Sequence, residues 1–323
     1  MREGSGTAGG AVLKDVRVLL AQTAPPRIAE GVAARFSPAP WDGAGAGVRG
    51  VAATGGTVDA ALMDRLPDLE IVANYGVGYD NIDAAEAGRR GIVVTNTPDV
   101  LNEEVADTAM GLLLAAVRRL PEADAYLRAG RWLQAPFPLT ATLRGRRMGV
   151  VGLGRIGKAI ARRAEAFGIA VSYHGRRRQP DVPYAYHPTL VGMAEAVDIL
   201  MVITPGGAET RHLVDANVLK ALGPEGVLIN VARGSVVDER ALIEALRNRT
   251  ILTAGLDVFE NEPQVPPELI AMEHVVLLPH VGSASVHTRN AMGQLVVDNL
   301  ASWFEGRGPL TPVPETPWPA PAT

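Results

Sequence analysis

The chain has 323 residues, 47% of them hydrophobic, which allows a large core and predicts two domains. Its formal net charge of −4 at pH 7 argues against a nucleic-acid partner. It contains no cysteine, which excludes disulfides, thiolate nucleophiles and cysteine metal sites, and we expect no metal. No apolar run approaches the about 20 residues of a membrane span, and no signal peptide is apparent, so we expect a cytoplasmic protein without a membrane partner.

The first part of the chain alternates short β-rich runs with helical patterns. A Gly-rich leader, residues 1–11, is expected to be disordered. The alternation that follows predicts a parallel sheet with helices on both faces. We expect strands at Val16–Leu20, Val51–Ala53, Glu70–Asn74 and Ile92–Thr95, and helices at Asp59–Leu66 and Asp83–Arg89.

A long helix is predicted next, from Asn102, a plausible N-cap, to Pro121, which should stop it. Its residues are apolar over most of the circumference. Such a pattern indicates burial between domains or subunits.

A glycine fingerprint opens a second α/β series. The strand Met148–Val151 leads into Gly152-Leu153-Gly154-Arg155-Ile156-Gly157, and a helix follows to Phe167. The first glycine allows a tight turn, the second lets backbone approach phosphates, and the third lets helix pack closely on strand. The helix N-terminus points amides at an anion. The pattern predicts a dinucleotide site.

The remaining elements predict one domain inserted into another. Strands are expected at Ala170–Tyr173, Ile199–Ile203, Val227–Val231, Thr253–Asp257 and Val275–Leu278, with helices from Asp238 to about Asn248 and from near Ser285 to Phe304. The predicted fold is α/β, with two doubly wound parallel-sheet domains: a Rossmann cofactor domain (103–287) inserted into a flavodoxin-like substrate domain (12–102 and 288–312), before a Pro-rich tail (313–323). A ligand cleft is expected at the carboxyl ends of the strands.

Three polar residues each follow a predicted strand of the second domain: Arg233, Glu262 and His280. Loops at one edge of a sheet can converge, and these groups fit a hydride-transfer site. The guanidinium would bind a substrate carboxylate and polarise the adjacent carbonyl. The imidazole would donate a proton to the carbonyl oxygen, while the carboxylate would orient the ring and favour its charged form.

Each of the three also has an ordinary structural explanation when taken alone. A lone arginine after a strand is often a surface charge, Glu-Pro is a common loop dipeptide, and one histidine of 6 can be structural. Together with other motifs, however, they carry a resemblance: residues from Tyr75 to about Val313 resemble the D-isomer-specific 2-hydroxyacid dehydrogenase family. The matching pieces are Gly76-Val77-Gly78-Tyr79-Asp80-Asn81-Ile82-Asp83, Gly152 to Gly157, Asn230 to Asp238, Gly255 to Pro263 and Pro279 to Ser283.

The resemblance implies roles for individual residues. Arg233, Glu262 and His280 match the family's catalytic triad. The resemblance also implies that Tyr75, Gly76, Val77 and Gly78 present amides to the substrate carboxylate, that Asp257 contacts the nicotinamide carboxamide, and that Val231 and Ala232 lie along the cofactor. By its chemistry alone, Asp257 could equally cap a strand end. The cofactor-binding residues implied are Gly152, Leu153, Gly154, Arg155, Ile156, Gly157, Gly175, Arg176, Arg177, Thr204, Pro205, Thr210, Val231, Ala232, Asp257 and Gly282.

The end of the second nucleotide-domain strand bears on which dinucleotide binds. NAD-selective sites place an acid about 20 residues past the glycines. Here the strand ends in Gly175-Arg176-Arg177-Arg178. A 2′-phosphate suits arginines and would be repelled by an acid. Although short basic runs are usually solvated loops, this position favours NADP (NADPH) over NAD.

Within the family, the chain looks most like the glyoxylate, hydroxypyruvate and hydroxyphenylpyruvate reductases. This resemblance implies NADPH-dependent reduction of a small 2-oxoacid to the D-2-hydroxy acid. One alternative is an NAD-linked D-lactate or 3-phosphoglycerate-type dehydrogenase, against which Gly175-Arg176 argues. A formate dehydrogenase is disfavoured, because that branch of the family has Gln where this chain has Glu262. A non-enzymatic, dinucleotide-sensing corepressor-like protein is disfavoured by the intact triad.

Other positions depart from the family or suggest a partner. Asp107 stands where the family usually has Glu, and Thr204-Pro205-Gly206-Gly207 carries glycines where bulkier residues are common. Trp132 would ordinarily be a core or interface anchor. The resemblance implies a homodimer in which the region around this tryptophan reaches toward the cleft of the neighbouring subunit. A role of Trp132 in shaping the substrate site is the alternative to the anchor role.

Overall fold

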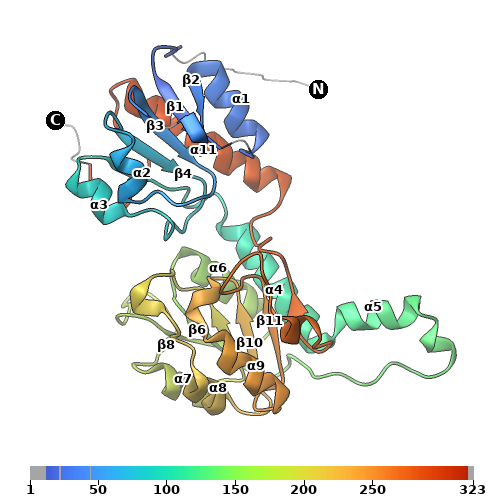
Figure 1. Cartoon of the computed structure of the whole chain (residues 1–323). Helices are drawn as coiled ribbons and strands as arrows, with labels where there is room; N and C mark the ends of the chain where they lie inside the picture. The colour runs from blue at the N-terminus through green and yellow to red at the C-terminus, as the bar shows by residue number, and fades with distance from the viewer. Residues whose placement is uncertain (1–11, 22, 44, 319–323) are drawn as a thin grey trace, which may run out of the picture. The chain divides into compact units, whose positions relative to one another are not determined.

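The computed structural model describes residues 12–21, 23–43 and 45–318, so the leader predicted over 1–11 and residues 319–323 of the tail lie outside the described residues. The chain divides into two compact units. The first contains the chain up to Leu101 together with the segment from Ser285 onward, and the second is Asn102–Ala284. Figure 1 shows the elements of each unit.

The first unit is built on a five-stranded sheet in the order β2-β1-β3-β4-β5. Its strands, all paired in parallel, are β1 (Arg17–Leu20), β2 (Ser37–Pro40), β3 (Val48–Ala53), β4 (Ile71–Asn74) and β5 (Val93–Thr95). This is the flavodoxin-like order predicted from the sequence, and it reverses between β1 and β3.

Helices cover both faces of this sheet because successive side chains of each strand point to opposite sides. Val18 packs with α1 (Pro26–Arg35) and α11 (Val286–Phe304). Leu19, the next residue, packs with α2 (Ala60–Asp64) and α3 (Ala84–Arg89). Burying each such side chain contributes about 1.5–3 kcal/mol. The sequence patterns do not predict α1 or β2. Strand β2 reads Ser-Pro-Ala-Pro, which is not a typical strand pattern. It lies at the edge of the sheet, where proline is tolerated.

The described end of the chain packs on the first unit. Val313 donates its amide to the carbonyl of Val94, 2.9 Å away, and Pro312 pairs with Thr95. Thr316 is buried, and its hydroxyl receives a hydrogen bond from the amide of Val94. The part of the Pro-rich tail up to residue 318 therefore packs beside β5 of the first sheet.

The second unit holds a seven-stranded parallel sheet in the order β12-β11-β10-β9-β6-β7-β8. Its strands are β6 (Arg147–Val151), β7 (Ala170–His174), β8 (Ala185–Tyr186), β9 (Ile199–Val202), β10 (Val227–Asn230), β11 (Thr253–Leu256) and β12 (Val276–Leu277). Counted from β6, this is the 3-2-1-4-5-6 Rossmann order with one strand added, and it reverses between β6 and β9.

Helices α4 (Asn102–Arg118) and α6 (Arg155–Ala166) pack against each other, and α4 also packs on β10 and β11. The apolar circumference of α4 is thus covered in part by its own unit. The other face of the sheet packs with α7 (Leu190–Ala196), α8 (Ala216–Leu222) and α9 (Glu239–Arg247). Asp238 caps α9 as predicted, its carboxylate accepting from the amide of Ala241.

The expectation that Pro121 ends the long helix is wrong. Helix α4 ends at Arg118, Arg119 adopts a left-handed φ of +50°, and Pro121 lies in the first turn of a further helix, α5 (Leu120–Arg128). Proline is tolerated there because first-turn amides have no intrahelical partner. Figure 1 shows α5 and the following loop projecting from the second unit.

Among the described residues, no helix is long and apolar enough to cross a membrane.

Candidate active site

The glycine loop joins β6 to α6, and each glycine is required for a different reason. Gly152 has a φ of +98°, and a Cβ there would lie 2.8 Å from Cα of Thr204. A Cβ at Gly157 would lie 2.4 Å from the carbonyl oxygen of Gly152. At Gly154, by contrast, a Cβ would meet nothing within 4 Å. The backbone at Gly154 is therefore open to a ligand, at the start of a helix with no side-chain cap, as a pyrophosphate requires.

The arginine run follows β7 and is tied to the glycine loop. Gln179 donates its amide Nε2 to the carbonyl oxygen of Leu153 at 2.7 Å, and its backbone amide donates to the hydroxyl of Tyr173 at 2.6 Å. The side chains of Arg176, Arg177 and Arg178 are exposed, and none forms an ion pair with the described residues. Because Gln179 anchors the segment after them, the arginines lie in a segment held at the glycine loop. These residues fit a dinucleotide with an added phosphate.

The second unit brings His280 and Glu262 into direct contact. Nδ1 of His280 lies 2.7 Å from Oε2 of Glu262, with the side chains 48% and 34% exposed. The other oxygen of Glu262 accepts from the amide of Phe259 at 3.0 Å. Since Glu262 occupies Nδ1, the opposite nitrogen Nε2 is directed away from the carboxylate.

Arg233 acts on the same carboxylate. Burial alone would raise the pKa of Glu262, but the hydrogen bond from His280, the amide of Phe259 and the charges of His280 and Arg233 lower it below its usual value. Glu262 is thus a carboxylate throughout the neutral range. The three residues form one electrostatic group, because the His280 contact and the charge of Arg233 both act on the ionised Glu262.

Close backbone packing brings two of the loops together. A Cβ on Gly234, the residue after Arg233, would lie 1.8 Å from the carbonyl carbon of Phe259. Only glycine allows this approach, so the backbone after Arg233 lies directly on the segment that carries Glu262. Glu260 also fixes this segment, because its carboxylate contacts the side chains of Arg211 and His212, each at 2.8 Å.

Asp257 organises the loop that carries His280. Its two carboxylate oxygens accept from the amides of Val281 and Gly282 at 2.7 and 2.8 Å, and its carbonyl accepts from the amide of His280. Burial raises the pKa of Asp257, although both amides oppose the shift. His280 itself has a left-handed φ of +53°. The observed contacts are those of a loop cap, one of the two roles considered for Asp257; the carboxamide contact stays a prediction.

The other predicted cofactor residues surround the strand ends of the same unit. Thr204 lies against Gly152, and the hydroxyl of Thr210 donates to the carbonyl of Pro205 at 2.8 Å, closing that glycine-containing loop. Val231 and Ala232 are buried after β10. The carbonyl of Gly175 accepts from the hydroxyl of Tyr186.

The predicted substrate loop, Tyr75 to Gly78, belongs to the first unit and follows β4. Asn74 donates from Nδ2 to the carbonyls of Gly76 and Gly78 at 3.1 and 2.9 Å. Asn96 donates to the carbonyl of Val77 at 2.8 Å. Because C=O and N–H point in opposite directions across a trans peptide, these bonds direct the amides of Val77 and Gly78 away from the asparagines. The loop thereby presents two amides suited to an anion.

Sequence reasoning missed the residues that support the site. These are Asn74 and Asn96 behind the substrate loop, Gln179 behind the glycine loop, and Glu260 with its two partners. Asn74 and Asn96 immediately end or follow predicted strands, a position that could have marked them. The side chain of Gln179 binds Leu153, 26 residues away, and the partners of Glu260 are 48 and 49 residues away, so no local pattern signals these contacts.

Comparisons with known proteins agree with this fold and site. A family model described as D-isomer specific 2-hydroxyacid dehydrogenase, NAD binding domain, matches residues 110–282. Glyoxylate/hydroxypyruvate reductase A of Arabidopsis thaliana is 55% identical over 255 residues, 79% of this chain and 82% of that protein. Hydroxyphenylpyruvate reductase of Plectranthus scutellarioides is 51% identical, with the same coverage. The structure of an NADPH-dependent glyoxylate/hydroxypyruvate reductase from Sinorhizobium meliloti, in complex with NADP and malonate, superposes with a TM-score of 0.92 at 55% identity, covering 96% of this chain and 100% of that one.

Two doubly wound sheets, a glycine loop and an Arg–Glu–His group define a dinucleotide-binding oxidoreductase. The chain belongs to the D-isomer-specific 2-hydroxyacid dehydrogenase family. This confirms the resemblance drawn from the sequence motifs.

Proposed function

We propose that this chain is an NADPH-dependent reductase that converts a small 2-oxoacid, of the glyoxylate or hydroxypyruvate type, to the D-2-hydroxy acid. The observation that carries the proposal is the 2.7 Å contact between His280 and Glu262, within reach of the charge of Arg233. The activities named for the similar proteins of Arabidopsis thaliana and Sinorhizobium meliloti support the substrate class.

Each group of the triad has one task in this reaction. When bound, the reduced nicotinamide supplies the hydride to the carbonyl carbon. Nε2 of His280 donates the proton that the carbonyl oxygen takes up. Glu262 holds the ring by Nδ1 and offsets its positive charge, and Arg233 binds the carboxylate of the 2-oxoacid by two hydrogen bonds. The amides of Val77 and Gly78 supply further donors for an anionic group.

NADPH is proposed as the preferred cofactor because three exposed arginines, and no acid, follow β7. Arg176 and Arg177 have no ion pair with the described residues, so their charge is available to a 2′-phosphate. The S. meliloti structure in complex with NADP supports this choice.

A homodimer is proposed from the projecting arm formed by α5 and the loop that follows it. The arm exposes large apolar side chains that a monomer would leave in water: Leu120, Leu127, Trp132, Leu133 and Leu139. Its shape is held internally, with the rings of Tyr126 and Phe137 5.4 Å apart. A second copy covering this arm would bury these side chains, and Trp132 would then shape the substrate site of the neighbouring subunit. Light scattering should give a dimer mass, and Leu133→Asp should yield monomers.

A panel of 2-oxoacids assayed with NADPH and with NADH tests the function. The proposal expects turnover of glyoxylate and hydroxypyruvate, with NADPH better than NADH. A corepressor-like protein would bind the dinucleotide without turnover, and an NAD-linked D-lactate or 3-phosphoglycerate-type dehydrogenase would favour NADH.

A further inference from the structure

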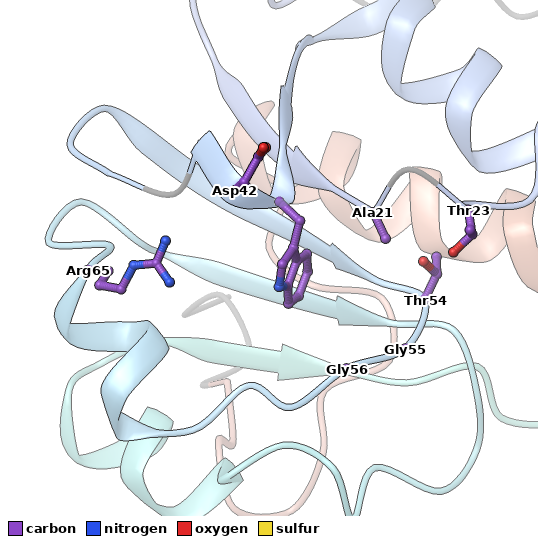
Figure 2. A pocket seen from close by; sticks show the side chains of 8 residues that line it. Ala21, Thr23, Asp42, Thr54, Gly55, Gly56 and Arg65 are labelled. Atoms are coloured by element: carbon purple, nitrogen blue, oxygen red, sulfur yellow. The ribbon is translucent and has the colours of Figure 1, made fainter. Parts of the chain in front are cut away.

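The second unit contains a cluster of three polar side chains, Arg211, His212 and Glu260, to which the proposed reaction gives no role. The first unit has a cavity of about 640 Å³ at the ends of β1, β2 and β3, shown in Figure 2. The Oγ1 atom of Thr54 at this cavity is buried, so it presents no surface to a ligand. The cluster around Glu260 carries more, because its contacts join two parts of the predicted active site.

One oxygen of Glu260 binds both of its partners. Oε1 accepts from Nη2 of Arg211 at 2.8 Å and lies 2.8 Å from Nε2 of His212. The side chain of Glu260 is 20% exposed and that of His212 is 35% exposed. Hydrogen bonds between ionised groups are stronger than those between neutral groups. The cluster therefore fixes the Glu260 carboxylate to the segment that carries Arg211 and His212.

Arg211 and His212 directly follow the loop 204–210, which we expect to lie along the cofactor. The first residue of this loop lies against Gly152 of the glycine loop. Beyond the other end, His212 has a left-handed φ of +50°, which residues other than glycine rarely adopt. Such a backbone conformation persists only where the surroundings hold it. Glu260 thus supports the far end of the predicted cofactor loop.

Glu260 also lies two residues before Glu262, on the segment that contacts the proposed general acid. The amide of Phe259 donates to Oε1 of Glu262 at 3.0 Å. Oε2 of Glu262 lies 2.7 Å from His280, which has a left-handed φ of +53°. The segment therefore holds two left-handed histidines, one with each of its two carboxylates. Through His212 it supports the cofactor loop, and through His280 it supports the proton donor.

The start of α9 anchors the same segment by a second acid. Oε2 of Glu239 accepts from the backbone amide of Glu260 at 3.2 Å. Burial raises the pKa of Glu239; the amide of Glu260 opposes this shift, and the negative charge of the Glu260 carboxylate adds to it. Two neighbouring carboxylates repel each other, so the positive charge of Arg211 is what keeps the Glu260 side chain in place.

We propose that Glu260 is a positioning residue that couples the predicted cofactor loop to the Glu262–His280 pair. Arg211 and His212 hold its side chain, while its backbone belongs to the segment that carries Glu262. Loss of these contacts frees both parts at once, since the cofactor loop loses its far support and Glu262 loses a fixed backbone. The inference rests on the proposed function, because the tasks of the loop and of the pair are those of that function.

Removal of the charge of Glu260 tests the coupling. In Glu260→Gln we expect Kd for NADPH, measured by titration of the ligand's fluorescence, to rise about threefold to tenfold, with a similar fall in kcat. Glu260→Asp keeps the charge, which the long side chain of Arg211 can follow, and should therefore lose less of both. Glu244→Gln removes another carboxylate that is paired with an arginine of the same unit, Arg247, and is the matched control. It should change neither quantity.

A double-mutant cycle shows whether Glu260 acts through Arg211. Kd for NADPH is compared in Glu260→Gln, in Arg211→Gln and in the double variant. Each single variant already breaks the same contact, so the double variant should lose no more affinity than the weaker of the two. Arg211→Gln and His212→Gln break the contacts from their more exposed side, and they give the same reading if Glu260→Gln does not fold.

Several results would overturn the coupling. These are a lower Tm of Glu260→Gln with unchanged NADPH affinity and kcat, equal losses in Glu260→Asp and Glu260→Gln, and losses that multiply in the double variant. If the unmodified protein binds NADPH but reduces no 2-oxoacid, the proposed function fails, while a rise in Kd shared by Glu260→Gln, Arg211→Gln and the double variant still supports the link to the cofactor loop. A protein that binds no NADPH would overturn both.

Discussion

The two units expose backbone amides at the ends of their parallel strands in different ways. In the second unit, the glycine loop depends on backbone shape: Gly152 and Gly157 allow close approach, and the surroundings of Gly154 are open. In the first unit, the loop after β4 depends on its neighbours, because Asn74 and Asn96 bind its carbonyls and so direct its amides. The backbone amides of a loop can thus be left open by a local glycine motif or directed by supporting side chains from adjacent strands.

The two units also differ in where their charged side chains lie. In the second unit Glu262 contacts His280 and lies within the electrostatic influence of Arg233, and an arginine run follows β7. The first unit has neutral donors at its loop, where the amide side chains of Asn74 and Asn96 bind the backbone carbonyls. We infer that proton donation and cofactor choice depend on the second unit, whereas the loop after β4 in the first unit contributes to substrate binding. Variants of each unit should separate these properties.

The largest effect is expected from His280→Ala in the second unit. Loss of the general acid should reduce kcat about 10²–10⁴-fold and leave NADPH affinity nearly unchanged. Steady-state kinetics and fluorescence titration measure the two quantities. His287→Ala, an exposed histidine of α11, is the matched control. Near-full turnover of His280→Ala would remove His280 from the mechanism.

Glu262→Gln tests the partner of that histidine. It replaces a charge-assisted hydrogen bond by a neutral one, so kcat should fall about tenfold or more. Because the carboxylate no longer faces Nδ1, the pH profile of kcat should differ from that of the unmodified protein. An unchanged pH profile of kcat would mean that Glu262 only supports the loop.

Arg176→Asp tests cofactor choice. Arg176 forms no ion pair with the described residues, and replacing its guanidinium by an acid should lower kcat/KM for NADPH about tenfold or more. The difference in kcat/KM between NADPH and NADH should become smaller. Arg144→Asp, at another exposed arginine of the same unit, should leave the ratio unchanged. Equal kcat/KM for the two cofactors in the unmodified protein would contradict the NADPH preference.

Asn96→Ala tests the first unit. Removing the donor to the carbonyl of Val77 should loosen the loop and raise KM for the 2-oxoacid roughly threefold to tenfold, with little change in NADPH affinity. Parallel titrations with substrate and cofactor distinguish the two. A loss of NADPH affinity as large as the rise in KM would contradict the assignment of substrate affinity to this unit.

The smallest effect concerns stability in acid. The pKa of Glu262 is lowered in the folded protein, so its carboxylate contributes stability above its unfolded pKa of about 4.3 and loses it as pH falls through the folded value. Glu262→Gln should therefore lose less stability than the unmodified protein between about pH 5 and pH 3 in urea unfolding. The exposed Glu195→Gln should behave like the unmodified protein; an identical acid response of Glu262→Gln would argue against the depressed pKa.

The sequence allowed the α/β class, the Rossmann and flavodoxin-like orders and the family to be predicted, because apolar runs alternate with helical periods and glycines mark the fingerprint. It did not predict β2, whose two prolines obscure an edge strand, or α5, which begins after a single left-handed residue. It named Arg233, Glu262 and His280 but not Asn96, Gln179 or Glu260. Asn96 directly follows a predicted strand, and this position could have marked it. The side-chain contacts of Gln179 and Glu260 join segments whose proximity depends on tertiary packing, so no local pattern signals them.

The most direct test of the central claim, that the His280–Glu262 pair supplies the proton during hydride transfer, is stopped-flow single turnover of bound NADPH with saturating hydroxypyruvate across pH. We expect a fast decay of NADPH absorbance in the unmodified protein, and this decay should slow as pH rises. In His280→Ala we expect a decay that is at least about a hundredfold slower and independent of pH. A His280→Ala protein with the rate and pH dependence of the unmodified one would contradict it.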